Sequence, residues 1–180
     1  MPDLLALAAI LSGVTASATQ FSILYWARWR ITLLRGVAVA LTLWAGHFAL
    51  LGALEVSALL LVAALYNLLV SRAPNRYWAG LTIAAFLALT LYQPTLNAWV
   101  VCLGSTLFVL GGLLRSTWAV RSFFLAGHAL FFLNAALLVS VTAMLNELLM
   151  AGANACAMLR DRASAGGPRS HPECEVVENR

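Results

Sequence analysis

The chain has 180 residues, of which 62% are hydrophobic and only 10% are charged, and its formal net charge is +4 at pH 7. A soluble domain of this length needs more charged surface, so the composition indicates an integral membrane protein. All eleven basic residues are arginines, and nine of them flank apolar blocks, where positive charge marks the cytoplasmic side of a membrane. The net charge is therefore interpreted as topological, and we expect no nucleic-acid partner.

Clusters of arginines divide the chain into apolar blocks. The clusters are Arg28/Arg30/Arg35, Arg72/Arg76, Arg115/Arg121 and Arg160/Arg162. The block before the first cluster is long enough for one crossing, and each later block for two, since about 20 helical residues span ~30 Å of hydrocarbon. The sequence therefore predicts an all-α protein with seven transmembrane helices and with every arginine cluster on one side. We place the helices over residues 4–27, 36–53, 55–71, 77–92, 95–114, 118–139 and 141–159.

The predicted breaks on the other side of the membrane are weaker. Gly52 with Glu55 marks the first, and Pro94 marks the second because proline disfavours helix at the residue before it. The third, around Val139 and Ser140, is inferred mainly from length, since one helix over 118–159 would run ~63 Å. The sequence places that boundary only to within several residues.

The orientation follows from the charges near the two sides. Arginines gather on one side and only Asp3 and Glu55 lie near the other, which predicts the N-terminus outside and the C-terminus inside. Residues 161–180 have little apolar content to bury, so we expect a disordered cytoplasmic tail.

An internal repeat emerges when the sequence is shifted by 87 residues. Arg28 then falls on Arg115, and Asn67 falls on Asn154. Each repeat holds three helices, and the helix between the repeats makes the two triplets parallel. We therefore predict a first triple-helix bundle at residues 1–72, a linking helix at 73–93 and a second bundle at 94–160.

Glu147 is the most costly residue in the predicted membrane segments. An ionised carboxylate there costs ~2.5–3.5 kcal/mol, which is tolerable if the side chain faces a wet cavity or finds a partner. The candidate partners are His128, Gln20 and Asn146. Two interpretations stay open: a substrate or proton site, and a protonated carboxyl group hydrogen-bonded between helices.

Asn67 and Asn154 occupy corresponding places in the third helix of each triplet. Two amides facing each other across a pseudo-twofold axis can bind the hydroxyl or amide groups of a small solute. The alternative is a hydrogen bond between helices, worth ~0.6–2 kcal/mol. We expect His47 and Gln20 to line the same path as these asparagines and Glu147.

Metal, cofactor and catalytic motifs are not found in the sequence. No HxxxH or CxxC spacing is present, so we predict neither a metal site nor a cofactor. No nucleophile motif, P-loop or paired acidic motif is present either, and we predict that the protein is not an enzyme. A membrane enzyme using Glu147 and His128 is a third class, but the two residues lack a usable sequence spacing for it.

Two stretches carry a resemblance to a known family. Leu43–Arg72 (LWAGHFALLGALEVSALLLVAALYNLLVSR) and Glu147–Arg160 (ELLMAGANACAMLR) resemble the matching stretches of YgjV-type bacterial inner-membrane proteins. This resemblance implies a multi-pass protein of the bacterial inner membrane, without an established activity. More distantly, the 3+1+3 plan looks like the SWEET and PQ-loop transporters, in which a pair of asparagines faces the sugar pocket. By position those asparagines would be Asn67 and Asn154.

The leading functional hypothesis is a transporter or carrier of a small polar solute, with its pocket between two pseudo-symmetric bundles. Asn67, Asn154, Glu147, His47 and Gln20 are the predicted binding residues. The alternative is a non-transporting membrane scaffold or sensor subunit, whose polar residues hold helices together. The expected partners are the lipid bilayer and the solute; a homo-oligomer is left open.

Overall fold

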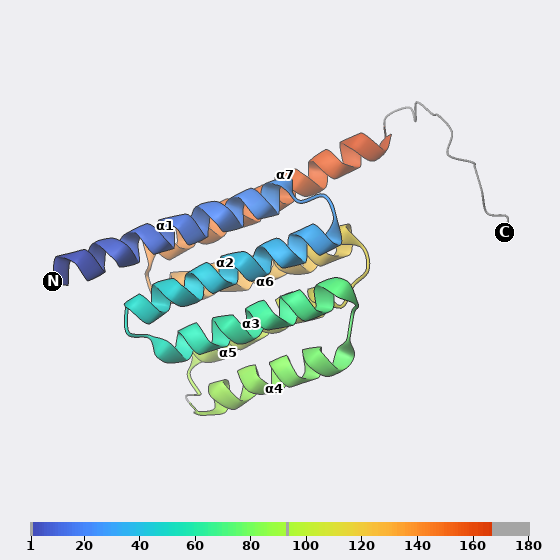
Figure 1. The fold of residues 1–180 in the computed structure, drawn as a ribbon. Helices are drawn as coiled ribbons and strands as arrows, with labels where there is room; N and C mark the ends of the chain where they lie inside the picture. The colour runs from blue at the N-terminus through green and yellow to red at the C-terminus, as the bar shows by residue number, and fades with distance from the viewer. Residues whose placement is uncertain (1, 93, 167–180) are drawn as a thin grey trace.

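The computed structural model describes residues 2–92 and 94–166, and the regular structure within these ranges is entirely helical (Figure 1). The helices are α1 (Pro2–Trp26), α2 (Arg30–Leu50), α3 (Leu54–Arg72), α4 (Arg76–Tyr92), α5 (Leu96–Gly112), α6 (Thr117–Leu137) and α7 (Val141–Gly166). The described residues therefore confirm the predicted all-α class with seven helices.

The helices form two layers. α1, α2 and α3 lie side by side in one layer, and α7, α6 and α5 lie behind them in the second (Figure 1). The layers meet where α1 contacts α7, where α2 contacts α6 and where α3 contacts α5. α4 lies at the edge of both layers, in contact with α3 and α5. The middle helices α2 and α6 consequently have neighbours on three sides.

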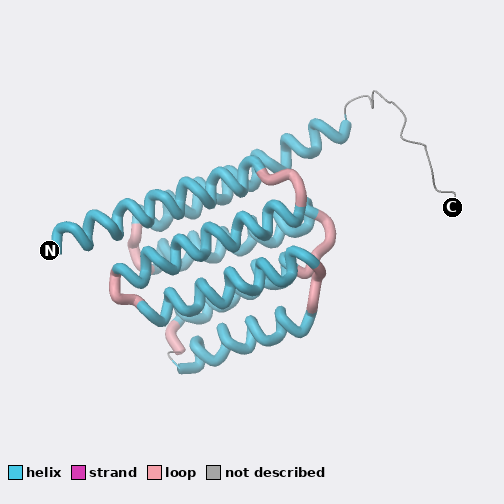
Figure 2. The backbone as a smooth tube through the Cα atoms, viewed as in Figure 1, coloured by secondary structure: helices cyan, strands magenta, loops and turns pink. Residues whose placement is uncertain are grey.

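The loops alternate between the two ends of the molecule. The loops that follow α1, α3 and α5 lie at one end, and those that follow α2, α4 and α6 lie at the other (Figure 2). We call the first the arginine end, because it holds Arg28, Arg72, Arg76, Arg115 and Arg160, and the second the far end. The arginine clusters thus share one end, as the sequence predicts.

Several helix boundaries agree with the sequence analysis and two do not. α6 ends at Leu137 and α7 begins at Val141, so the turn predicted around Val139 is present, with Val139 in the left-handed region at φ 53°. α2, however, begins at Arg30 rather than at residue 36, because arginine is a good helix former and does not itself end a helix. α7 continues to Gly166, so residues 161–166 of the predicted tail are helical; residues 167–180 lie outside the described part.

The surface of the molecule suits a bilayer. Among the described residues, three helical segments are long and apolar enough to cross a membrane, Leu7–Trp26, Arg30–Leu50 and Thr117–Leu137, while Val56–Arg72 and Leu96–Gly112 are apolar but shorter. Large apolar side chains are exposed along the outer helices, with Ile10 at 62% and Val14 at 63%. In water such a surface would aggregate, whereas in lipid it needs no cover.

Glycines bring α5 and α6 close together. A Cβ atom at Gly111 would lie 2.8 Å from Cβ of Phe123, and one at Gly127 would lie 2.9 Å from Cζ of Phe108. Helices in lipid associate through such close packing, since lipid tails are as apolar as leucine. The same pair of helices holds part of the candidate site, because α6 also carries His128.

Candidate functional site

Glu147 pairs with His128 in the interior of the helix bundle. The two helices α6 and α7 are joined by a tight turn, so their side chains meet along a shared face. Oε2 of Glu147 lies 2.7 Å from Nδ1 of His128. The His128 side chain is 3% exposed and that of Glu147 is 18% exposed. Of the three partners considered for Glu147 in the sequence analysis, the imidazole of His128 is the one in closest contact.

This pair belongs to a polar chain that reaches a third helix. Nδ2 of Asn146 lies 3.5 Å from Oε1 of Glu147, and the Ser17 hydroxyl of α1 donates to Oδ1 of Asn146 at 3.3 Å. On the other side, Nε2 of His128 is buried without a hydrogen-bond partner among the described residues. Buried polar atoms in proteins are almost always hydrogen-bonded. This nitrogen is not, so it can still bind a further polar group. The chain of contacts thus joins α1, α7 and α6.

Asn154 lies nearer the arginine end and is engaged with Arg121. Its Oδ1 accepts from Nη1 of Arg121 at 2.9 Å, and its Nδ2 donates to the Arg121 carbonyl oxygen at 2.7 Å. Both residues are fully buried. The Asn154 amide therefore makes the interhelical link that the sequence analysis held as the alternative to solute binding.

The sequence places Arg121 in a cytoplasmic cluster, yet it is the largest fully buried side chain among the residues that the structure describes. Its Nη1 donates to the Leu24 carbonyl oxygen at 2.5 Å, and its Nη2 donates to that of Ala27. These carbonyls belong to the end of α1, where the helix leaves its last acceptors unsatisfied. The available signal was its place several residues inside α6, whereas Arg115, the other arginine of its pair, precedes that helix.

Arg30 performs a similar task at the start of α2. Its Nε donates to the Leu114 carbonyl oxygen at 2.6 Å, and its Nη2 donates to those of Gly112 at 2.6 Å and Val70 at 2.8 Å. It therefore ties the ends of α3 and α5 together. Arg160 adds a further link, since its Nη1 donates to the Tyr25 carbonyl oxygen of α1 at 2.8 Å.

Asn67 is buried on α3, away from Asn154. Its Nδ2 donates to the Ala63 carbonyl oxygen of its own helix at 2.8 Å, and its Oδ1 is buried without a partner in the described part of the chain. α3 lies at the edge of one layer and α7 at the opposite edge of the other (Figure 1). The structure therefore does not bring the two asparagines together.

His47 and Gln20 form a separate polar cluster between α1 and α2. Nδ1 of His47 lies 2.8 Å from the Ala9 carbonyl oxygen and 3.3 Å from the Ser12 hydroxyl. Oε1 of Gln20 accepts from Nε1 of Trp44 at 2.9 Å. Nδ1 of His47 and Oε1 of Gln20 thus have partners on a neighbouring helix, and within the described residues neither side chain contacts Glu147. Their place on a solute path stays a prediction.

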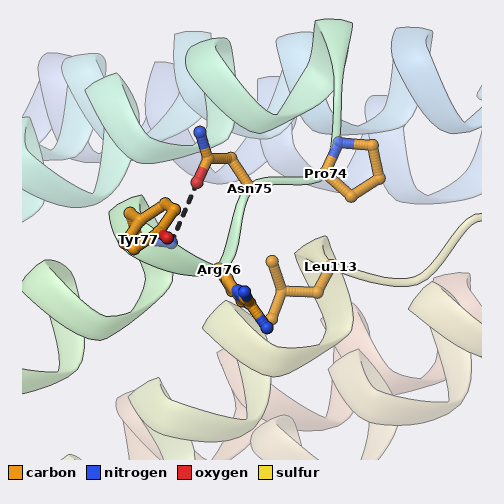
Figure 3. Close-up of a pocket in the computed structure, with 5 residues that line it drawn as sticks. All are labelled: Pro74, Asn75, Arg76, Tyr77 and Leu113. Atoms are coloured by element: carbon orange, nitrogen blue, oxygen red, sulfur yellow. Dashed lines mark hydrogen bonds between the residues drawn. The ribbon is translucent and has the colours of Figure 1, made fainter.

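Two hollows open on the surface of the protein. One, of about 470 Å³, lies at the arginine end and is lined by Pro74, Asn75, Arg76, Tyr77 and Leu113 (Figure 3). There Oδ1 of Asn75 accepts from the backbone N–H of Tyr77 at 2.9 Å, which shapes the start of α4. The other, of about 580 Å³, lies between α1 and α2. Neither is lined by any of the predicted binding residues Asn67, Asn154, Glu147, His47 or Gln20.

The exposed apolar surface, the common arginine end and the buried polar pair define an all-helical membrane protein. A family described as bacterial inner membrane protein, Imp-YgjV, matches residues 7–165. Since the match covers most of the chain, the protein belongs to the Imp-YgjV family of bacterial inner membrane proteins. No curated protein and no solved structure matches the chain. The family description gives the location and leaves the activity undefined.

Proposed function

We propose that the protein is a transporter or carrier of a small polar solute, with the Glu147–His128 pair at the centre of its site. The observation that carries this proposal is the 2.7 Å contact between a carboxyl group and an imidazole inside apolar helices. Ionisable groups are expensive in a membrane and usually mark substrate pathways or proton relays. Binding and passage are proposed here, rather than catalysis.

The proposed membrane arrangement has seven crossings, an external N-terminus and two parallel triplets linked by α4. The helix contacts support this arrangement. If α1, α2 and α3 of the first triplet correspond to α5, α6 and α7 of the second, then the contact between α1 and α7 corresponds to the contact between α5 and α3, and both are present. The arginines support it too. Arg30 on α2 binds carbonyls at the end of α5, and Arg121 on α6 binds carbonyls at the end of α1. The positive-inside rule then assigns the arginine end to the cytoplasm.

Within this proposal the residues have separate roles. Glu147 and His128 hold or exchange a proton between them and present a polar surface to the solute. Within the described residues Nε2 of His128 and Oδ1 of Asn67 lack partners. The nitrogen can donate or accept according to the tautomer and the oxygen can accept, so a solute or water would satisfy both. Asn154 acts indirectly, because its amide holds Arg121.

The experiment is thermal unfolding of the purified protein in detergent against sugars, amino acids, organic acids and amines. A ligand at 100 times its Kd stabilises a protein by ~2.7 kcal/mol, so binding raises Tm measurably. We expect one solute class to raise the Tm of the wild type and not that of Glu147→Gln. The matched control is Glu55→Gln at the start of α3, which should keep the response.

The second hypothesis is a non-transporting scaffold or sensor subunit. The links between helices favour it, above all the engagement of Asn154 with Arg121 and of His47 with α1. If no solute raises Tm, while Glu147→Gln lowers Tm in the absence of solute, the polar pair holds helices together and the transport proposal fails.

A further inference from the structure

The hollow between α1 and α2 combines polar and apolar side chains at the arginine end. Its polar lining includes Ser22, Thr32 and Arg35, and its apolar lining includes Trp26 and Val39. All five side chains are exposed. The hollow therefore faces the surroundings of the protein rather than the interface between the two layers.

The hollow has a closed floor, because α1 and α2 approach closely beneath it. A Cβ atom at Gly36 would lie 2.6 Å from Cγ2 of Ile23, so only glycine permits this distance between the helices. Both residues line the hollow. A ligand seated there would contact side chains on either side without passing between the helices.

Arg35 provides the positive charge of the hollow. Its Nε lies 3.4 Å from the buried Ser71 hydroxyl of α3, which holds the base of the guanidinium group. A guanidinium group carries five N–H donors, so this contact leaves donors for an anion. Arg35 lies about 7.5 Å along α2 from Arg30, at 1.5 Å per residue. Arg35 therefore lies further from the arginine end than Arg30 does.

The apolar lining lies where an acyl chain would run. Val39 follows Arg35 by one turn toward the far end. Trp26, 68% exposed, lies at the end of α1, and such rings favour the headgroup layer. A free phosphate ion would contact Arg35 and leave the apolar side chains of the hollow without a partner. A phospholipid would contact both, through its phosphate and an acyl chain.

We propose that this hollow binds an anionic glycerophospholipid of the leaflet at the arginine end. Its phosphate would bind Arg35, with Ser22 and Thr32 as hydroxyl donors, and one acyl chain would lie along Gly36 and Val39. Arginine suits phosphate because its N–H groups match the phosphate oxygens in pairs. This site is separate from Glu147 and does not depend on the proposed transport function.

The test is titration of the purified protein in detergent with phosphatidylglycerol, followed by thermal unfolding and by native mass spectrometry of retained lipid. We expect phosphatidylglycerol to raise Tm, and phosphatidylcholine and glycerol phosphate to have little effect. Arg35→Gln should weaken the apparent affinity about fivefold, which corresponds to ~1 kcal/mol per arginine near an anionic surface. Val39→Trp, which fills the hollow and keeps the charge, should weaken it as well.

The matched control is Arg28→Gln, since Arg28 is an exposed arginine at the same end that does not line the hollow. It should keep the affinity of the wild type. An equal loss in Arg28→Gln would indicate diffuse attraction and overturn the proposal. Equal stabilisation by phosphatidylcholine would overturn it too, and stabilisation by glycerol phosphate alone would replace the lipid with a free anion.

Discussion

Arg121 shows how a buried charge can stabilise the end of a neighbouring helix. Its guanidinium group is surrounded by the carbonyl oxygens of Leu24 and Ala27 and by the amide of Asn154. An acid lies beside it, with Oδ2 of Asp161 at 4.0 Å from Nε. The arginine thus satisfies acceptors that neither water nor lipid reaches, and α1, α6 and α7 meet around it.

We predict that Arg121→Gln lowers the free energy of unfolding by roughly 2–4 kcal/mol, because each buried acceptor left without a donor costs about 1–3 kcal/mol. Thermal unfolding in detergent measures this loss. Arg115→Gln is the control, since Arg115 is exposed at the same end, and its Tm should stay close to that of the wild type. Equal losses in the two variants would contradict a specific role for Arg121.

Residue-scale features were only partly predictable. A carboxyl group in an apolar helix needs a partner on energetic grounds, so a contact for Glu147 was expected. Its identity depended on the packing of α6 against α7, which the sequence does not give. Arg121 was missed because arginines at apolar boundaries usually face the headgroups, and burial depends on acceptors supplied by distant residues such as Leu24.

At the scale of elements, the contact between α5 and α6 depends on small residues. The nearest atom to a Cβ at Gly111 would be Cβ of Phe123, which cannot move without its backbone. By contrast, a Cβ at Gly80 on α4 would meet nothing within 4 Å. The two glycines are therefore a matched pair for testing close packing.

We predict that Gly111→Ala lowers the free energy of unfolding by about 1–3 kcal/mol, the usual cost of forcing an extra methyl into a packed interface. Gly80→Ala should be neutral or stabilise the protein by up to ~1 kcal/mol, because alanine is the better helix former. Thermal unfolding of both variants provides the comparison. Equal Tm values would mean that α5 and α6 can separate at no cost.

Helix positions were more predictable than helix ends. The apolar blocks located the seven helices of the described residues, and the turn at Val139 followed mainly from length. The start predicted for α2 is too late, because arginines at the border of an apolar block are expected to flank the helix, whereas Arg30 and Arg35 lie within it. The side chains of both arginines contact residues outside α2, and the backbone of α2 is helical through both positions.

For the whole molecule, alternation of the loops gives two chemically different ends. The sequence predicted a common side for the arginines, and the structure confirms it. The order of the helices within the two layers could not be predicted, because leucine-rich faces pack against one another with little discrimination. That order separates Asn67 from Asn154.

We predict that the arginine end is cytoplasmic. In a chain without its native cysteines, Leu51→Cys at the far end should react with an impermeant maleimide in intact cells. Ala73→Cys, exposed at the arginine end, should react only after the membrane is permeabilised. The reverse pattern would contradict the positive-inside assignment.

In the proposed transporter, the face of α7 that bears Glu147 opens to water and solute. The direct measurement is the reaction of single cysteines with a small charged thiosulfonate in intact membranes, at Ala151→Cys and at Ala157→Cys. Ala151 lies one turn from Glu147 on the same face, whereas Ala157 is fully buried. We predict rapid reaction at position 151, slowed by the stabilising solute, and none at 157. An inert cysteine at position 151 would contradict a solute path there and favour the scaffold.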